Sequence, residues 1–209
     1  MARPAAVAFA RPTDRADEFG ASPGTVRFVD VPSHRFVMID GQGAPGDATF
    51  APRMPGLYAT AYTLHFALKR RGAVDRIGPL EGLWWPADGA AGQDIAAGVD
   101  QGGWHWTLLI GLADVASPEE LAAALTAGRA KLVEPYAANL RIEALEEGRT
   151  AQIMHLGPYD AEGPTIGRLH AAIAAAGLRA RDVHHELYLG DPRRSAPARL
   201  RTLVRQPVD

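Results

Sequence analysis

The same succession of predicted elements occurs twice along the chain. In residues 26–112, two strands precede a helix and two strands follow it, and residues 138–209 contain the same order. A helix predicted over residues 118–134 links these halves. Since sheets and helices must each bury an apolar side, two such units side by side form one layered domain. The sequence therefore predicts an α+β fold: tandem βαββ repeats with pseudo-twofold symmetry, one antiparallel sheet with helices on one face, and a ligand groove on the other.

Apolar residues at helical spacing define the helix of the first half, predicted over residues 55–71. Its core stripe consists of Leu57, Ala61, Leu64 and Leu68, and the stripe beside it of Tyr58, Tyr62 and Phe66. Ser117 and Glu120 have the spacing of a capping box at the start of the linking helix. In the second half, a helix is predicted over residues 165–176.

Strands are predicted where short apolar or aromatic runs are bounded by Gly, Pro or Asp. They cover residues 26–31, 35–40, 79–86, 104–110, 140–146, 150–156, 184–189 and 200–207. Glu147-Gly148 is expected to turn the chain so that the strands at 140–146 and 150–156 are neighbours. Segments 41–47 and 87–103 are predicted loops. The first contains Gly-x-Gly but lacks the third glycine and the lysine of phosphate-binding loops.

Composition excludes several classes of function. The 209 residues carry a net charge of −2, so no basic field favours nucleic acid. The absence of cysteine excludes disulfides and thiolate chemistry. Residues 1–25 are rich in Ala, Pro and Arg and are expected to form a loosely ordered arm, too short for a DNA-binding helix-turn-helix. With neither a secretory signal nor a membrane-spanning stretch in the sequence, a cytoplasmic location is expected.

One predicted strand, at residues 184–189, carries ionisable side chains among apolar ones. Because side chains alternate between faces, His184, Glu186 and Tyr188 share one face. We expect the other face, which carries His185, Leu187 and Leu189, to rest on helices. A carboxylate in such a strand is costly unless it is solvated, paired or used. Glu186 is thus either an exposed residue on a wet sheet face or an acid that acts on a small molecule.

All four tryptophans fall in two predicted strands. Alternation places Trp104 and Trp106 on one face, whereas Trp84 and Trp85 point opposite ways. At least three indoles are therefore expected on one sheet face. They either fill a core or form the walls of a site for an aromatic ligand.

Two other kinds of site are less favoured by the sequence. His155, His184, His185 and Glu186 are candidate metal ligands, but adjacent strand residues face opposite ways and no His-Glu-x-x-His occurs there. No Gly-x-Ser-x-Gly supports a serine hydrolase. The sequence therefore predicts neither a metal nor another cofactor.

Several motifs resemble those of the stand-alone branch of the GyrI-like small-molecule-binding family. The similarity extends over residues 26–208. The motifs, in order, are Asp30-Val31-Pro32, Phe36-Val37-Met38-Ile39-Asp40-Gly41, Pro79-Leu80-Glu81-Gly82-Leu83-Trp84-Trp85, Gln152-Ile153-Met154-His155-Leu156-Gly157-Pro158-Tyr159-Asp160, His184-His185-Glu186-Leu187-Tyr188-Leu189 and Asp191-Pro192-Arg193-Arg194.

This resemblance implies the tandem βαββ fold and a site for flat, often cationic aromatic compounds with an acidic residue at its floor. It also implies hydrolysis of cyclopropanoid genotoxins, an activity associated with this branch, and thus a role in detoxification. The acidic position corresponds to Glu186. The expected partner is a small hydrophobic or cationic aromatic molecule, with no nucleic acid and no membrane.

Two functions from different classes follow. As a hydrolase, the protein would use Glu186 as the base for an attacking water, assisted by Tyr188 and by His155 or His184. Burial is expected to raise the pKa of Glu186. The alternative is a protein that binds and sequesters cationic aromatic drugs without chemistry; a peptide-binding adaptor is a weaker third possibility. The residues expected to line the site are Tyr62, Trp84, Trp104, Trp106, Tyr188, His155 and His184.

Overall fold

The computed structural model describes residues 16–44, 48, 50–73, 76–87 and 103–209. Its eight strands form one antiparallel sheet in the order β1-β6-β8-β7-β3-β4-β2-β5. The strands are β1 Arg27–Val31, β2 His34–Gln42, β3 Leu80–Trp85, β4 His105–Gly111, β5 Arg141–Leu145, β6 Gly148–Leu156, β7 His184–Tyr188 and β8 Arg201–Pro207. The α-helices are α1 Ala16–Phe19, α2 Met54–Arg70, α3 Pro118–Arg129, α4 Tyr136–Asn139 and α5 Gly163–Ala175, and the 3-10 helices are η1 Ala51–Arg53, η4 Tyr159–Ala161 and η5 Pro197–Arg199.

The two halves exchange their first strands. β5 pairs with β2 of the first half, and β1 pairs with β6 of the second. The prediction that the strands at 140–146 and 150–156 are neighbours is therefore wrong. The rest of the order is symmetric about the β7–β3 ladder, which confirms the pseudo-twofold arrangement of two βαββ units.

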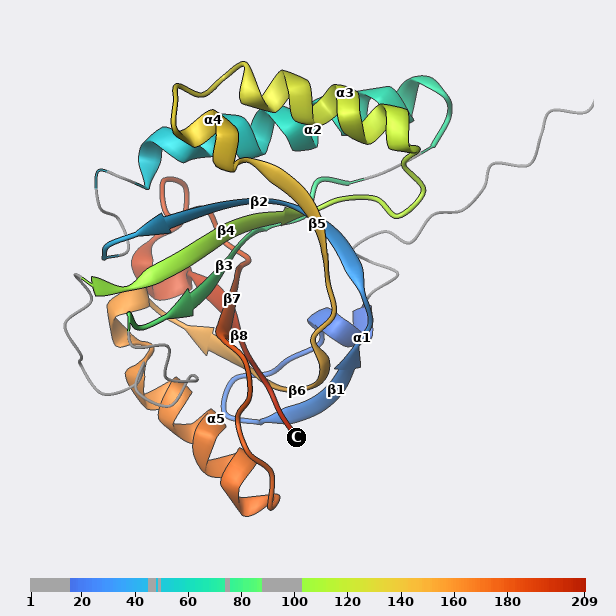
Figure 1. Ribbon diagram of the computed structural model, residues 1–209. Coiled ribbons are helices and arrows are strands. Elements are labelled where there is room, and N and C mark those ends of the chain that lie inside the picture. Colours follow the sequence, from blue (N-terminus) through green and yellow to red (C-terminus); the bar gives the residue numbers. More distant parts are fainter. Residues whose placement is uncertain (1–15, 45–47, 49, 74–75, 88–102) are drawn as a thin grey trace, which may run out of the picture.

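Short connections force the sheet to curl. β5 is an edge strand and β6 is next to the opposite edge, yet only Glu146 and Glu147 connect them. Pro32 and Ser33 likewise connect β1 to β2. Because each residue spans at most about 3.6 Å, such connections bring the two ends of the sheet within roughly 10 Å of each other. Figure 1 shows the resulting curl, with α2, α3, α4 and α5 on its outer side.

The main hydrophobic core lies between the outer face of the sheet and these helices. The predicted stripe of α2 is buried there, as are Ile166, Leu169 and Ile173 of α5. α2 packs on β2 and β4, whereas α5 packs on β6. The helix contacts thus concentrate on either side of the central strands β3 and β7.

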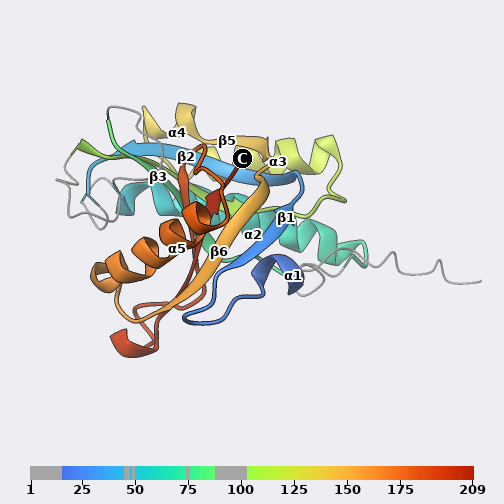
Figure 2. The same cartoon turned by 90° about the horizontal axis from the view of Figure 1, so that it is seen from below.

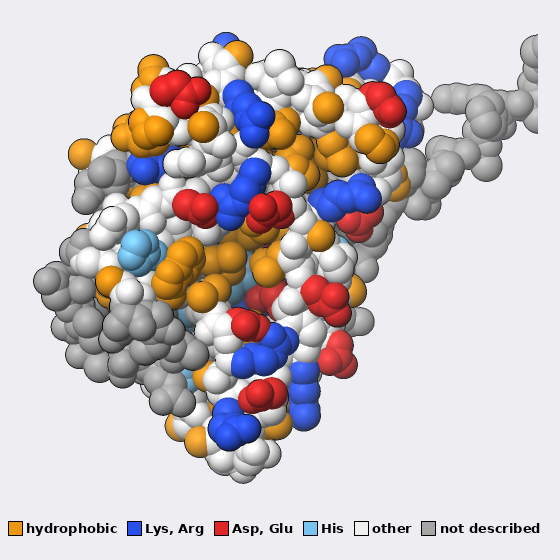
Figure 3. All heavy atoms as spheres, viewed as in Figure 1, with side chains coloured by type: hydrophobic (Ala, Val, Ile, Leu, Met, Phe, Trp, Pro, Cys, Tyr) orange, Lys and Arg blue, Asp and Glu red, His pale blue; other side chains and the backbone are white. Residues whose placement is uncertain are grey.

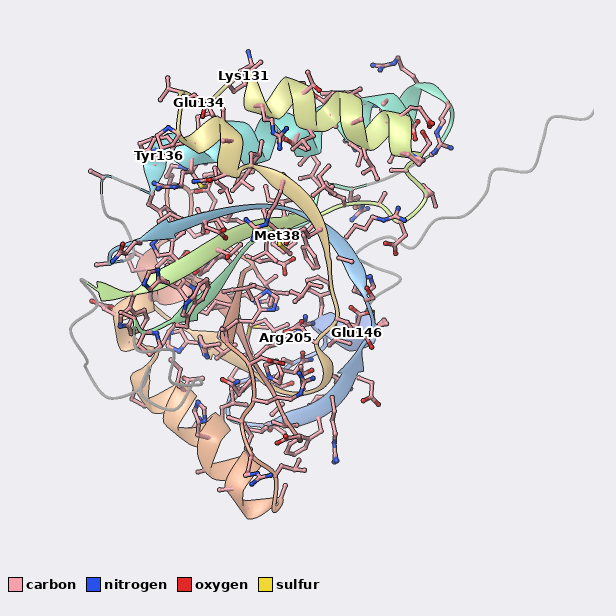
Figure 4. All side chains as sticks on the ribbon, in the orientation of Figure 1. Met38, Lys131, Glu134, Tyr136, Glu146 and Arg205 are labelled. Carbon is pink, nitrogen blue, oxygen red and sulfur yellow. The ribbon has the colours of Figure 1, made fainter. Side chains whose placement is uncertain are left out.

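The inner face of the curl has apolar cores of its own. One contains Phe36, Met38 and Leu109, and the other contains Met154, Leu187 and Leu203. Figure 4 shows Met38 and Arg205 pointing into the space that the curl encloses. Figure 3 shows hydrophobic side chains in the middle of this view, with charged side chains around them.

The side of β7 that meets the helices differs from the prediction. Leu187 and Leu189 belong to the inner core, whereas Tyr188 packs against the core that contains the helices. Glu186 shares the helix-bearing face because it alternates with Leu187. A flat sheet would have only one face to bury, but a curled sheet buries both, so apolar content alone does not identify the helix side.

A chain of ion pairs crosses the inside of the curl. His185 has no exposed surface, and its Nε2 lies 2.9 Å from Glu81 Oε2 while its Nδ1 lies 2.9 Å from Glu147 Oε1. Arg205 Nη1 is 3.1 Å from the other Glu147 oxygen, and Arg205 Nε donates to Gln152 at 2.9 Å. Glu81 and Glu147 thus pair with His185 and Arg205 inside the curl. The connection between β5 and β6 brings Glu147 into this space.

The segment before β1 is anchored to this network. Residues 1–15 of the predicted loose arm lie outside the described part of the chain, but residues 16–25 belong to the fold. Arg205 donates to the carbonyl of Glu18, Gln152 donates to that of Gly20 at 3.0 Å, and Phe19 packs in the inner core. Figures 1 and 2 show α1 beside β1.

The capping box of the linking helix was predicted correctly, but the C-terminal ends of that helix and of β2 were not. The capping box is confirmed: Ser117 Oγ accepts from the Glu120 amide at 3.2 Å, and Glu120 Oε2 accepts from the Ser117 amide at 2.9 Å. The linking helix ends at Arg129 rather than at residue 134. β2 continues through Gln42, so Gly41 is not in the predicted loop.

Packing explains this position of Gly41. A Cβ there would lie 2.1 Å from Cη2 of Trp106, so only a glycine lets this indole pack against β2. Residues 45–47 of the loop predicted at 41–47 lie outside the described residues, as do residues 88–102 of the loop predicted at 87–103.

Stability should depend on the protonation of His185. Burial by itself lowers the pKa of His185, but the charge and hydrogen bonds of Glu147 and Glu81 outweigh it and raise the pKa to about 9. Between pH 6.5 and 9 the folded chain therefore keeps a proton that the unfolded chain has released. We expect the free energy of unfolding to fall through this window, by roughly 3 kcal/mol at most. Urea unfolding at a series of pH values measures this change.

Two variants separate this effect from general alkaline loss of stability. His185→Gln should weaken the pH dependence, whereas Arg193→Gln, at an exposed ion pair with Asp191, should leave it unchanged. A wild-type urea midpoint that stays constant from pH 6.5 to 9 would contradict a protonated, paired His185.

Candidate functional site

The candidate site lies on the outer face of the β7–β3 ladder, where the two halves meet. Glu186 is opposite Gly82 and His184 is opposite Trp84. Since directly paired residues share a face, these side chains come together between the regions covered by α2 and α5. The predicted association of the acid with the junction of the halves is thus present, on the face that bears the helices.

Glu186 is held by neighbours on its own strand. The Tyr188 hydroxyl donates to Glu186 Oε2 at 2.8 Å, and the same hydroxyl accepts from Trp84 Nε1 at 3.1 Å. His184 Nε2 lies 3.3 Å from Glu186 Oε1. The Glu186 side chain is 13% exposed, so the acid is neither in bulk water nor sealed from it.

Gly82 makes this arrangement possible. A Cβ at residue 82 would lie 2.6 Å from Trp84 Nε1 and 2.9 Å from the Tyr188 hydroxyl oxygen. Side chains of other residues would therefore occupy the place where the indole and the phenol meet.

Three indoles cluster on the helix-bearing face, as alternation predicted. Trp84 lies 6.3 Å from both Trp104 and Trp106, measured between ring centroids. Phe50 stacks on Trp84 at 6.3 Å and meets Trp106 edge-on at 5.2 Å. Trp85 is on the opposite face, where it stacks on His105. The three clustered indoles are buried in the core on the helix-bearing face, and Trp84 is linked to the acid through the Tyr188 hydroxyl.

Glu162 is a second acid at the site, and sequence reasoning missed it. It precedes α5 and is only 4% exposed, and its side chain is in hydrogen-bond contact with that of Glu186. Burial and the negative charge of Glu186 raise the pKa of Glu162 to about 9. Its position two residues before Pro164, at a helix start, gives an exposed capping acid as the ordinary interpretation, so no local signal distinguishes it.

The pKa shifts differ from the sequence-based expectation. Burial by itself raises the pKa of Glu186, but hydrogen bonds from His184, Tyr188 and Glu162 outweigh it, and the pKa lies below its usual value. The raised carboxyl pKa belongs to Glu162 instead. Burial and the charge of Glu186 also raise the pKa of Tyr188 well above its usual value. At neutral pH the site therefore holds one carboxylate, one carboxylic acid and one phenol.

One further tyrosine borders this cluster, and another lies near the segment that follows β7. Tyr159 of η4 meets Tyr188 edge-on, with ring centroids 5.4 Å apart. Tyr58 of α2 is half-buried, and burial raises its pKa. The charges of Arg193 and Asp191 act on Tyr58, so α2 approaches the segment that follows β7.

The structure does not bring Tyr62 or His155 to Glu186. Tyr62 is 49% exposed and its ring contacts are with Tyr58 and Phe66 along α2. His155 Nδ1 lies 3.0 Å from the Thr165 hydroxyl, and its Nε2 lies 3.2 Å from the Pro158 carbonyl oxygen. His155 thus ties the end of β6 to the start of α5 instead of contacting the acid.

Within the described residues, no group of three or more His, Cys, Asp or Glu side chains has the arrangement of a metal site. No described helix has the length and hydrophobicity needed to cross a membrane.

Replacing Gly82 by alanine tests the close contact at the site. Because the added Cβ displaces Trp84 and Tyr188, Gly82→Ala should lower the free energy of unfolding by roughly 1–3 kcal/mol and change the tryptophan fluorescence. Gly167→Ala is the matched control, since nothing lies within 4 Å of that helical position. It should stabilise α5 by up to about 1 kcal/mol. Equal urea midpoints for the two variants would contradict the packing described here.

Comparisons with known proteins place this fold in a family. A hydrolase from Listeria innocua has 28% sequence identity and a TM-score of 0.77, with 95% of this chain and 99% of that chain covered. An uncharacterized conserved protein from Listeria innocua has 28% identity and a TM-score of 0.80 over the same shares. The EcmrR C-terminal domain shares the fold alone, with 11% identity and a TM-score of 0.55 over 88% of this chain and 97% of that one.

No curated protein matches the chain. The family described as the GyrI-like small molecule binding domain matches residues 24–209. This span includes the whole sheet, both symmetric halves and every residue of the candidate site. The chain belongs to the GyrI-like small-molecule-binding domain family.

Proposed function

We propose that this protein is a detoxifying hydrolase that opens the strained ring of cyclopropanoid genotoxins, using Glu186 to activate water. The observation that carries the proposal is a largely buried carboxylate, held by Tyr188 and His184 and linked through Tyr188 to the indole of Trp84. A carboxylate kept ionised away from bulk water is a strong hydrogen-bond acceptor for a single bound water.

The comparison with the Listeria innocua hydrolase supports a hydrolytic reaction. The similarity extends over nearly the whole of both chains, so it includes the strands that carry the site. Family membership supports a small molecule as the substrate. The cyclopropanoid class is what the resemblance of the sequence motifs implies, and the carboxyl and aromatic side chains present are compatible with that reaction.

The proposed reaction adds one water molecule. The water oxygen forms a bond to a ring methylene carbon, and the bond between that carbon and the ring carbon attached to the dienone breaks. Its electron pair moves through the conjugated system to the carbonyl oxygen, which becomes a phenolate and takes a proton from solvent. Glu186 accepts the proton of the attacking water as the C–O bond forms. A water molecule becomes much more acidic as this bond forms, so a carboxylate with a lowered pKa still accepts its proton.

The acceptor capacity of Glu186 leaves room for that water. A carboxylate has about four lone-pair sites. Hydrogen bonds with Tyr188, His184 and Glu162 use three of these sites. The remaining site, on a side chain with 13% exposure, is the proposed position of the attacking water.

Tyr188 and the indoles have separate proposed roles. The Tyr188 proton is used on Glu186, so this phenol orients the carboxylate and does not donate to the substrate. The buried indoles Trp84, Trp104 and Trp106 are proposed to exclude bulk water from one side of the carboxylate. Trp84 joins the two sets because its ring nitrogen donates to Tyr188.

Binding of a cationic aromatic compound without chemistry is the second candidate function. It is favoured by one observation: the carboxylate of Glu186 keeps its negative charge beside aromatic rings. A cation over an indole face gains about 2 kcal/mol or more where water is excluded. The same residues serve both functions, so turnover decides between them.

Turnover of a spirocyclopropyl cyclohexadienone tests the proposal directly. The wild-type chain should remove the dienone absorbance and yield a product heavier by one water. Glu186→Gln should slow turnover by about 10²–10⁴-fold, because the amide does not accept the proton of water. Glu146→Gln, at an exposed glutamate in Figure 4, should retain the wild-type rate.

Three results would contradict hydrolysis or the role of Glu186 in it. Equal rates for wild type and Glu186→Gln exclude Glu186 as the base. An intact dienone with tight binding of a cationic aromatic dye supports sequestration instead. Equal loss of activity in Glu146→Gln assigns the effect to a general change in charge.

A further inference from the structure

Glu162 has a fixed place beside the proposed base. Its carbonyl oxygen accepts from the amides of Thr165 at 2.8 Å and Ile166 at 3.0 Å, so the first turn of α5 holds its backbone. Its side chain is buried and in contact with the carboxylate of Glu186. The two acids come from different elements, and only the packing of α5 on the sheet brings them together.

The hydrogen bonds around the two acids determine which one is ionised. Two carboxylates in contact and out of water do not both stay charged. Glu186 is the acid that the Tyr188 hydroxyl contacts, at 2.8 Å, with His184 3.3 Å away. Glu162, in contrast, has Thr202 as the side chain that favours its charged form, and its Oε1 is buried without a hydrogen-bond partner among the described residues. The shared proton therefore resides on Glu162.

We infer that Glu162 is a positioning residue: a neutral carboxylic acid that donates its proton to the Glu186 carboxylate and keeps that carboxylate ionised and oriented. The inference rests on the proposed function, because it concerns the same site. It also limits the ligand, since the pair presents one negative charge rather than two. A second charge would repel the oxyanion that develops on the opening substrate.

Among the described residues, titratable groups that face the pair come from β7 and η4. His184 and Tyr188 lie on β7 with Glu186, and Tyr159 of η4 faces Glu162. Thr202 of β8 also contacts Glu162 but does not titrate. Burial and the charge of Glu186 raise the pKa of Glu162 to about 9, so a second negative charge appears only in alkaline solution.

Two substitutions of Glu162 separate proton sharing from simple packing. The amide of Glu162→Gln still donates a hydrogen bond to Glu186 but never ionises. The side chain of Glu162→Leu has similar volume and no donor. We expect Gln to keep dienone turnover within about threefold of wild type at pH 7, whereas Leu loses at least tenfold.

The pH profile is the readout that a merely structural residue would not change. Wild-type turnover should decline as pH rises towards 9, and Glu162→Gln should lack that decline. The inference is overturned if Gln loses as much activity as Leu, or if the alkaline decline persists in Gln.

A measurement without substrate separates this inference from the proposed reaction. The unfolded chain releases the Glu162 proton near pH 4.5, but the folded chain keeps it to about pH 9. The free energy of unfolding therefore decreases as pH rises between these two values. Between pH 4.5 and 6.5, below the range where His185 contributes, the wild-type urea midpoint should fall more steeply than that of Glu162→Gln.

The combined results assign any failure to one proposal. If the wild-type chain leaves the dienone intact, the proposed reaction is wrong. The urea midpoints then still test whether Glu162 holds the shared proton. Equal slopes for wild type and Glu162→Gln between pH 4.5 and 6.5 overturn the inference whether or not turnover is observed.

Discussion

Two-residue connections between strands at opposite ends of the sheet impose the curl on which the remaining structure depends. Because Glu146 and Glu147 alone join β5 to β6, the sheet encloses an inner core and pushes its helices to the outer side. Glu147, at this junction, pairs with His185 in the middle of the sheet and with Arg205. The network thus ties the junction of the exchanged strands to β7, the strand that carries the proposed base.

The curl gives β7 two buried faces with different electrostatics. On the inner face, Glu147 and Glu81 meet His185, and Arg205 completes the compensation of charge. On the outer face, Glu186 meets a second acid, Glu162, so one proton is kept between them. Because the charges of the inner cluster compensate each other, no net charge remains there for a ligand to neutralise. This cluster is therefore interpreted as structural. An ionised acid held by a neutral one is available to a ligand, which is why the outer face is the candidate site.

Much of the fold followed from local pattern. Helical spacing located the buried face of α2, and the Ser117 capping box located the start of α3. Strand alternation correctly grouped Trp84, Trp104 and Trp106 and placed Tyr188 beside Glu186. Tyr62 and His155 were also expected at the site, but their contacts are elsewhere. Strand alternation and helical spacing indicate which residues share a face of an element. They do not indicate which of those residues the neighbouring element contacts.

By itself, the sequence determined the elements, the tandem order and the family motifs, because spacing and capping act between residues close along the chain. Only the tertiary structure decided the strand exchange, the side of the sheet that bears helices, and the meeting of Glu162 with Glu186. The physical reason is that burial and charge pairing depend on distances across the sheet. A glutamate before a helix has an ordinary pKa in water, and packing against another acid changes it.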